Sequence, residues 1–113
     1  MTTYLLKVAT NGSMTRIAFD KAKSYDQLSN AVGGYLEAVP CPNNGGHDLY
    51  CNEEGKLEGL PLNPVMTRFW RARLATDDFL VGDCVFANCD EEGETLGLTA
   101  EECDALEAQL KAA

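Results

Sequence analysis

The sequence predicts an α+β fold, with a mainly antiparallel sheet of about five strands and two or three short helices packed mostly on one face. Short apolar runs separated by turns rich in Gly, Asn and Pro are typical of antiparallel strands. Capping signals also precede segments whose apolar residues lie three or four positions apart, as in short helices. With 113 residues and 45% hydrophobic content, the chain is expected to form one domain, residues 1–113, around its own core.

The N-terminal segment is expected to form a hairpin followed by a helix. Residues 4–9 and 14–19 are predicted strands, and the Asn-Gly-Ser sequence between them is a tight-turn signal. Ser24 and Gln27 have the spacing of a capping box and predict that a helix begins there. Gly33-Gly34 is expected to end this helix after about two and a half turns.

Two further strands are expected on either side of a loop. Residues 35–39 alternate in polarity and predict a strand that ends at proline, and residues 48–52 predict the next strand. Residues 41–47 are rich in turn-forming residues and are interpreted as the loop between these strands. Residues 53–56 are interpreted as a turn, in which Gly55 is suited to positive φ.

The C-terminal half is expected to contain two helices and a strand. Asn63 is predicted to cap a helix over residues 64–73, because proline at the first helical position follows it. Residues 80–89 are a predicted strand. Thr99 and Glu102 form a second capping box and predict a final amphipathic helix near the C-terminus.

Charge is unevenly distributed along the chain. Residues 1–76 carry eight basic and seven acidic side chains, whereas residues 77–113 carry eleven acidic side chains and only Lys111, within a formal net charge of −9. This balance repels nucleic acid and anionic membrane surfaces, so direct binding to either is not expected. The acidic third is interpreted as a solvated helix and turn, or alternatively as a partner-binding face that imitates DNA phosphates.

Five cysteines and one histidine are the candidate metal-binding and catalytic residues. An odd number of cysteines without a secretion signal favours free thiols over a disulfide framework. Cys41, His47 and Cys51 are close in sequence but lack the tight spacing of structural zinc sites, so neither a metal nor another cofactor is expected. The alternative is an enzyme that uses Cys41 or Cys51 with His47. No oxyanion-type glycine turn or general acid accompanies them, so we expect a non-catalytic protein.

The strongest functional signal is a cluster of arginines around the only tryptophan. Three of the four arginines lie in the run RFWRAR, residues 68–73. Guanidinium groups bind phosphate oxygens in pairs, and an indole ring offers a stacking face. This pattern predicts that Arg68 and Arg71 bind the phosphates of a nucleotide-like ligand while Trp70, Tyr35 or Phe69 stacks on its base. Alternatively, the arginine stems cover apolar surface and pair with carboxylates, and Trp70 lies in the core.

A second polar group follows the strand predicted at residues 48–52. The run Asn52-Glu53-Glu54-Gly55-Lys56 lacks the ligand spacing of a calcium loop and is interpreted as a hairpin turn. Alternatively, this polar group, with Asn52 and Glu54, lines a pocket next to residues 59–63, in which the amides of Asn52 and Asn63 offer hydrogen bonds to a ligand. The chain therefore contains two groups of candidate ligand-binding residues, one basic and aromatic and the other polar.

Three runs of the sequence carry a family resemblance. AVGGYLEAVP (31–40), LYCNEEGKLEGLPLN (49–63) and GDCVFANCDEEGETLGLT (82–99), in this order and spacing, closely resemble the domain-of-unknown-function family 3846. The resemblance covers nearly the whole chain, and it includes the family's signature, which is the turn at residues 52–56 followed by Gly59-Leu60-Pro61 and Asn63. Members of that family are small proteins of phages, plasmids and their bacterial hosts without a settled activity. The resemblance therefore implies a fold and a biological setting, but no reaction.

The function expected from these observations is binding without catalysis. We expect a phage or mobile-element accessory protein, acting in counter-defence, that binds and sequesters a small nucleotide-derived ligand. The alternative is an acidic, DNA-mimic-like inhibitor of a host defence nuclease or other host protein, acting through residues 90–94 and 101–107. No signal peptide or membrane span is recognisable, so we expect a cytoplasmic protein, in the host cytoplasm if phage-encoded. An exposed edge strand and the small size favour a homo-oligomer.

Overall fold

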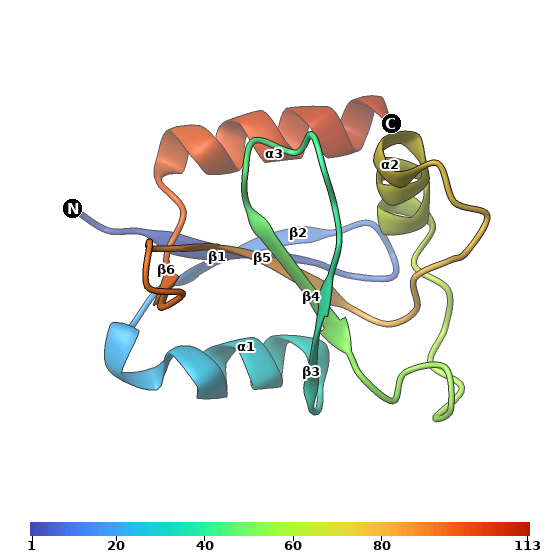
Figure 1. Cartoon of the computed structure of the whole chain (residues 1–113), viewed down its shortest axis with the longest axis horizontal. Helices are drawn as coiled ribbons and strands as arrows, with labels where there is room; N and C mark the ends of the chain where they lie inside the picture. Colours follow the sequence, from blue (N-terminus) through green and yellow to red (C-terminus); the bar gives the residue numbers. More distant parts are fainter.

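A six-stranded antiparallel sheet lies at the centre of the computed structural model, which describes residues 1–113 (Figure 1). The strand order is β2-β1-β5-β4-β3, and the short β6 pairs with the end of β5. The strands are β1 (Tyr4–Val8), β2 (Met14–Ala18), β3 (Leu36–Val39), β4 (Asp48–Asn52), β5 (Cys84–Cys89) and β6 (Thr95–Leu96). The helices are α1 (Ser24–Val32), α2 (Pro64–Leu74) and α3 (Ala100–Ala112). The predicted α+β class is therefore confirmed.

The helices cover both faces of the sheet. In Figure 1, α3 lies on one side of the strands and α1 on the other. Strand residues alternate between the faces, so Leu6 and Phe86 join the larger buried cluster with α2 and α3, whereas Leu5 and Val85 join a smaller cluster with α1. Two of the three helices thus share one face, called here the α2–α3 face. No helix combines the length and apolar composition needed to cross a bilayer.

Most predicted turns and caps are present. The hairpin closes with the Ala9 amide donating to the Ser13 carbonyl. Gly33 ends α1 with φ of 79° and donates its amide to Ser29. The Asn63 side chain accepts from the Met66 amide and caps α2. The Thr99 capping box begins α3, whose predicted apolar stripe is buried against the sheet.

The capping box predicted at Ser24 and Gln27 was wrong. Ser24 is already inside α1, and Lys23 in front of it makes no side-chain cap. Asp20 instead caps a short 3-10 turn, and the side chain of Gln27 accepts a hydrogen bond from the Asp20 amide. A second helical turn therefore precedes α1 and moves the capping residue upstream.

Two other local predictions also differ from the structure. The strand predicted to begin at residue 80 begins at Cys84, because Gly82 has φ of 73° and interrupts the extended chain. In the segment after β4, Gly59 takes the positive φ, of 68°, that was expected at Gly55. A Cβ at Gly55 would lie 3.0 Å from Val81, so close packing accounts for that glycine.

Candidate functional site

A cleft of about 360 Å³ opens beside β3, where this strand meets α2 and two irregular segments. The irregular segments are residues 53–57, after β4, and residues 78–81, before β5. The cleft is lined by Glu37, Ala38, Val39, Pro40, Cys51, Asn52, Glu53, Lys56, Leu57, Trp70, Asp78, Phe79, Leu80 and Val81. Its concave, mixed apolar and polar lining is typical of a binding site.

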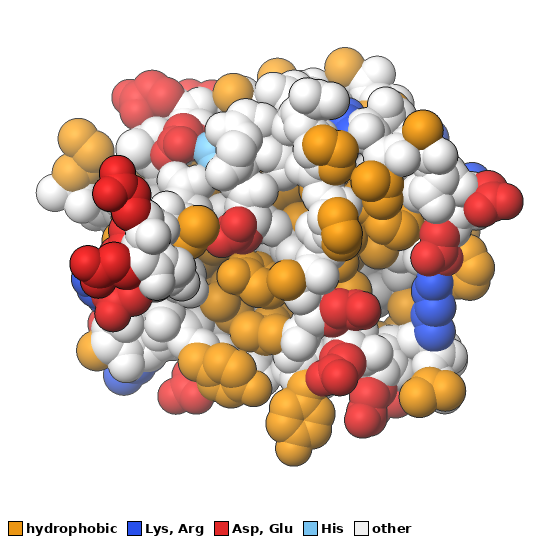
Figure 2. Space-filling view, in the orientation of Figure 1, with side chains coloured by type: hydrophobic (Ala, Val, Ile, Leu, Met, Phe, Trp, Pro, Cys, Tyr) orange, Lys and Arg blue, Asp and Glu red, His pale blue; other side chains and the backbone are white.

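The apolar part of the cleft has a buried wall and an exposed rim. Trp70 is 6% exposed and belongs to the core, and its Nε1 donates a 2.6 Å hydrogen bond to the Pro40 carbonyl. Leu57 and Phe79 on the rim are 91% and 42% exposed. Figure 2, drawn in the orientation of Figure 1, shows hydrophobic side chains gathered across the middle of the visible surface, with acidic side chains around them. Burial of these rim residues by a ligand would be favourable.

The cleft follows the free outer edge of the sheet. Four consecutive residues, 37–40, line it. Because successive side chains of a strand point to opposite faces, this means that the cleft runs along the backbone edge of β3. The Glu53 amide donates to the Tyr35 carbonyl, so alternate residues of β3 bond to β4. In this register, the backbone groups of Leu36 and Ala38 point away from β4 and toward solvent.

The polar groups of the cleft carry net negative charge. Glu37, Glu53 and Asp78 are acidic, and Lys56 is the basic residue of the lining. Lys56 bonds to Asp78 at 2.6 Å and lies 4.4 Å from the centre of the Phe79 ring. The hydrogen bond from Lys56 and that from the Phe79 amide lower the pKa of Asp78. The cleft therefore favours neutral or cationic groups over anions.

The thiol in the cleft is not activated. Burial, followed by the charge of Glu37, raises the pKa of Cys51 to about 12, and the thiol points to a Glu37 oxygen at 3.7 Å. Burial also raises the pKa of Cys41. No hydrogen bond joins His47 to either thiol, since its Nδ1 lies 2.5 Å from the side-chain oxygen of Asn88. The arrangement gives no support to a Cys–His enzyme.

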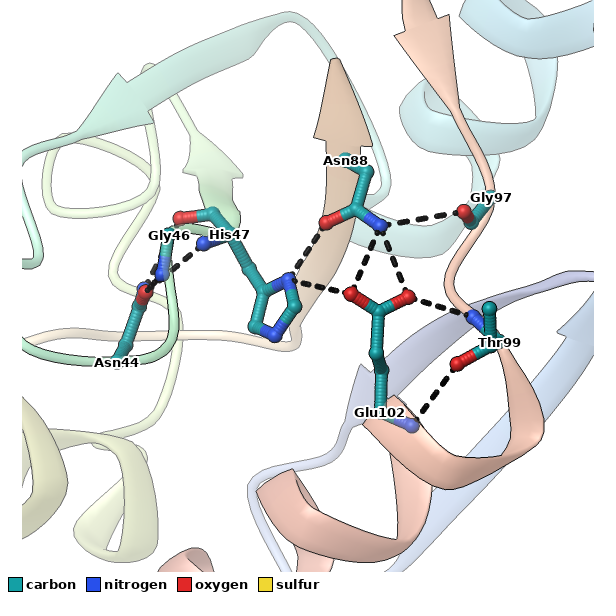
Figure 3. A network of polar contacts seen from close by, with 7 residues as sticks. All are labelled: Asn44, Gly46, His47, Asn88, Gly97, Thr99 and Glu102. Carbon is teal, nitrogen blue, oxygen red and sulfur yellow. Dashed lines mark hydrogen bonds and ion pairs between the residues drawn. The ribbon is translucent and has the colours of Figure 1, made fainter. Parts of the chain in front are cut away.

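A polar network ties the loop between β3 and β4 to the end of β5 and the start of α3 (Figure 3). Asn44 accepts from the His47 amide, and the His47 ring contacts Asn88 of β5. The Asn88 amide donates to Glu102, whose side chain also accepts from the Thr99 amide. Burial raises the pKa of Glu102, but the hydrogen bonds from Thr99 and Asn88 outweigh it, and the pKa lies below its ordinary value. The network therefore supports the loop that begins at Pro40.

The arginines of the predicted phosphate site lie outside the cleft. Arg68 and Arg71 are exposed on the outer side of α2. Arg71 donates to the backbone carbonyls of Asp77 and Asp78 at 2.9 and 2.7 Å. Arg71 thus holds the segment that forms one wall of the cleft, whereas Arg68 makes no hydrogen bond or ion pair. The structure brings neither guanidinium group together with a face of Trp70.

The other predicted site residues have different surroundings. Asn52 lines the cleft, but its side chain accepts from the Glu54 amide and donates to the Val32 carbonyl. The side chain of Glu54 is exposed outside the cleft, and Tyr35 is 67% exposed at the start of β3. Trp70 and Asn52 are therefore the two predicted residues that the cleft brings together.

Asn63 has a structural role at the centre of the molecule. It is fully buried, and its side-chain amide donates to the carbonyls of Val8 and Gly82 at 3.0 and 2.9 Å. Its side-chain oxygen accepts from the Met66 amide at 3.1 Å. The bond from Met66 caps α2, and the two donated bonds connect the start of α2 to β1 and to the chain before β5. No donor or acceptor of this side chain faces the cleft.

Many carboxylates of the acidic C-terminal third are bound within the molecule. Arg16 of β2 bonds to Asp104 and Glu107 at 2.5 and 2.8 Å and fastens α3 to the sheet. Lys21 lies 3.4 Å from Glu94. Asp90 accepts from two backbone amides of the turn that follows it. The acidic face is thus partly neutralised, which gives little support to a phosphate-like row of charges.

Glu37, Leu57 and Phe79 were not predicted to line a site, and Lys56 was included only as part of the polar run 52–56. Leu57 and Phe79 lie outside helices and strands. A large apolar residue there is not part of a helix or strand face that packs into the core. Their position in such segments is the sequence signal that could have identified them. The sequence could not assign Glu37 and Lys56 to the same cleft, because only the folded structure brings these two residues together.

The comparisons with known proteins agree with the sequence resemblance. The family described as Domain of unknown function (DUF3846) matches residues 1–111. No curated protein and no solved structure matches the chain. The match spans every strand and nearly all of α3, so it covers both the sheet and the cleft. The chain therefore belongs to the DUF3846 family of domains of unknown function.

Proposed function

We propose that this protein is a non-catalytic binding protein that attaches to a partner protein along the outer edge of β3 and the cleft beside it. The observation that carries the proposal is that residues 37–40 line one cleft next to a free strand edge. An edge strand offers unpaired amides and carbonyls to an extended segment, and neighbouring pockets accept its side chains. Leu57 and Phe79 supply exposed apolar area on the rim.

The charge of the cleft supports a protein partner over an anionic small molecule. Three carboxylates and one ammonium group surround the opening, and the whole chain has a formal net charge of −9. A basic partner would gain both local attraction and long-range steering. The sequence-based alternative, inhibition of a host protein, is thus better supported at this edge than on the acidic C-terminal third.

The biological setting of the proposal comes from the family resemblance. Proteins that phages and plasmids carry can act by occupying a surface of a host defence protein in the cytoplasm, without chemistry of their own. We propose this counter-defence role for the β3 edge. It requires a partner surface, but no cofactor and no activated thiol, and Cys51 is held in its protonated form.

A second candidate is a small nucleotide-derived ligand that enters the cleft with its base. Phe79 offers an exposed ring beside Lys56, and Asn52 lies in the same lining. Lys56 bonds to the Asp78 carboxylate, so one phosphate could take the place of that carboxylate. Glu37 and Glu53 disfavour ligands with several phosphates. Thermal-shift and calorimetric titrations with a nucleoside monophosphate, cyclic dinucleotides and ADP-ribose test this candidate, which fails if none of them binds.

The partner-binding proposal is tested by recovering cross-linked complexes from host cells. Ala38→Pro removes an outward amide while leaving the β3–β4 bonds in place. The matched control is Ala18→Pro, which removes an outward amide at β2, the opposite edge. We expect a partner that cross-links to the wild type and to Ala18→Pro but not to Ala38→Pro. Equal recovery of that partner with both variants would contradict the proposal.

A further inference from the structure

We propose that the segment recognised at this edge is an extended basic strand, which pairs with the backbone of Leu36 and Ala38 and places a lysine or arginine opposite Glu37. This inference rests on the proposed function and specifies the chemistry of the partner. It combines three properties of β3: its free backbone groups, the direction of its side chains and the charges around the cleft.

The free backbone groups set the geometry of pairing. Leu36 and Ala38 are two residues apart in β3, so together they offer two amides and two carbonyls along one line. Ala38 is exposed and Leu36 is half-buried. An added strand would bond to both residues, and its side chains would alternate between the α1 face and the α2–α3 face of the sheet.

The side chain of Glu37 determines the preferred residue on the α2–α3 face. Glu37 is paired with Cys51 of β4, and the Cys51 thiol points to its carboxylate at 3.7 Å. A partner residue opposite Glu37 would project to the same face, at the mouth of the cleft. Glu53 lies in the same lining and adds negative charge, whereas Lys56 already bonds to Asp78 and lies over the Phe79 ring. Lysine or arginine satisfies these groups, whereas glutamate or aspartate opposes them.

A second copy of this chain fits the edge less well. Antiparallel pairing of two β3 strands centred on Glu37 would pair Leu36 with Ala38 of the copy and place the two Glu37 side chains directly opposite each other. Like charges directly opposite each other are destabilising in a sheet. The edge is therefore suited to a basic segment of a different protein, and self-association through β3 is an outcome that the test can detect.

Peptide titrations followed by NMR test the inference. The probe is a seven-residue peptide that alternates valine with lysine, and its controls replace lysine with glutamate or N-methylate alternate backbone nitrogens. We expect the lysine peptide to shift the amides of Leu36 and Ala38 and to bind at least about fivefold more tightly than the glutamate peptide. N-methylation should abolish these shifts, because it removes the strand donors.

Two protein variants separate charge from backbone pairing. Glu37→Gln should lower the affinity for the lysine peptide by roughly two- to fivefold, as expected for the loss of an exposed ion pair. It should also remove part of the preference for the lysine peptide over the glutamate peptide. Ala38→Pro should remove binding of both peptides, whereas Ala18→Pro should leave it unchanged. Glu37 and Ala38 are exposed, so both variants are expected to keep the dispersed amide spectrum of the folded protein.

The outcomes distinguish this inference from the function on which it rests. Equal affinity for the two peptides, or shifts confined to residues outside β3 and the cleft, would overturn the basic-strand inference. If a cross-linked partner is still lost with Ala38→Pro, the proposed function stands without it. If neither the binding of the peptide nor the recovery of the partner depends on Ala38, both the inference and the proposed function fail. A concentration-dependent dimer that Ala38→Pro disrupts would identify a second copy as the occupant and would overturn the inference.

Discussion

Trp70 donates from Nε1 to the Pro40 carbonyl at 2.6 Å, and this bond fixes the end of β3 against α2. The indole contributes to the core and to the wall of the cleft at the same time. The shape of the candidate site thus depends on a residue that the core needs. Trp70 is also the only tryptophan, so its fluorescence reports directly on this part of the structure.

Replacement of Trp70 by phenylalanine should destabilise the fold. Trp70→Phe leaves the Pro40 carbonyl without its donor and removes buried volume, so we expect the free energy of unfolding to fall by about 1–3 kcal/mol. Urea unfolding followed by circular dichroism measures this change without tryptophan fluorescence. Phe79→Leu is the control on the exposed rim and should change stability by less than about 1 kcal/mol. Equal effects of the two changes would contradict the role assigned to the Trp70 bond.

Asn63→Ala should cost more than the loss of an ordinary helix cap. The substitution removes a cap from α2 and leaves two buried carbonyls, of Val8 and Gly82, without their donor. We expect the free energy of unfolding to decrease by about 2–4 kcal/mol, measured by urea denaturation. Asn30→Ala, on the exposed side of α1, is the matched control and should have little effect. A decrease in unfolding free energy of less than about 1 kcal/mol would show that Asn63 does not connect α2 to β1 and to the chain before β5 as the hydrogen bonds indicate.

The cysteines should react with iodoacetamide in an order set by burial. Cys89 is exposed and should be modified first at pH 8, even though hydrogen bonding to Asp48 raises its pKa. Cys51 should react slowly, because its pKa is about 12 and its thiol is buried. Mass spectrometry of digested protein measures both rates, and Cys89→Ser should remove the fast phase. Fast alkylation of Cys51 in folded protein would indicate a thiolate and would favour an enzyme.

Acid should weaken the network around Glu102. The pKa of Glu102 in the folded protein lies below its ordinary value of 4.5, so its ionised form contributes stability above that pH. This contribution is lost as the pH falls through the lowered pKa. The decrease in unfolding free energy between pH 6 and pH 3 should therefore be smaller for Glu102→Gln than for the wild type, and Glu101→Gln, on the exposed side of α3, is the control. Parallel curves for Glu102→Gln and the wild type would contradict the assigned role.

Local signals in the sequence were sufficient for most of the fold. The Asn-Gly hairpin, the cap at Asn63 and the capping box at Thr99 depend on residues within a few positions of each other, and each is present. Ser24 failed because Asp20, four residues upstream, competes as the cap of a preceding turn. The strand order could not be predicted, since the position of β5 between β1 and β4 depends on contacts between distant segments.

The site was harder to predict for the same reason. The arginine cluster is a feature of one helix, and the sequence does not show that Arg71 folds back on the backbone of Asp77 and Asp78. Glu37 and Phe79 are 42 positions apart and share a cleft only because β3 is the outermost strand of the sheet. Charge composition alone also could not show that Arg16 neutralises part of the acidic helix.

Amide hydrogen exchange along β3 tests the central claim most directly. In the free protein, the amides of Glu37 and Val39 should be protected, because they bond to β4, while those of Leu36 and Ala38 exchange rapidly. Binding of the partner, or of the lysine peptide, should slow the exchange of Leu36 and Ala38 and leave β2 unchanged. Rapid exchange of both amides in the bound complex would contradict strand addition at this edge.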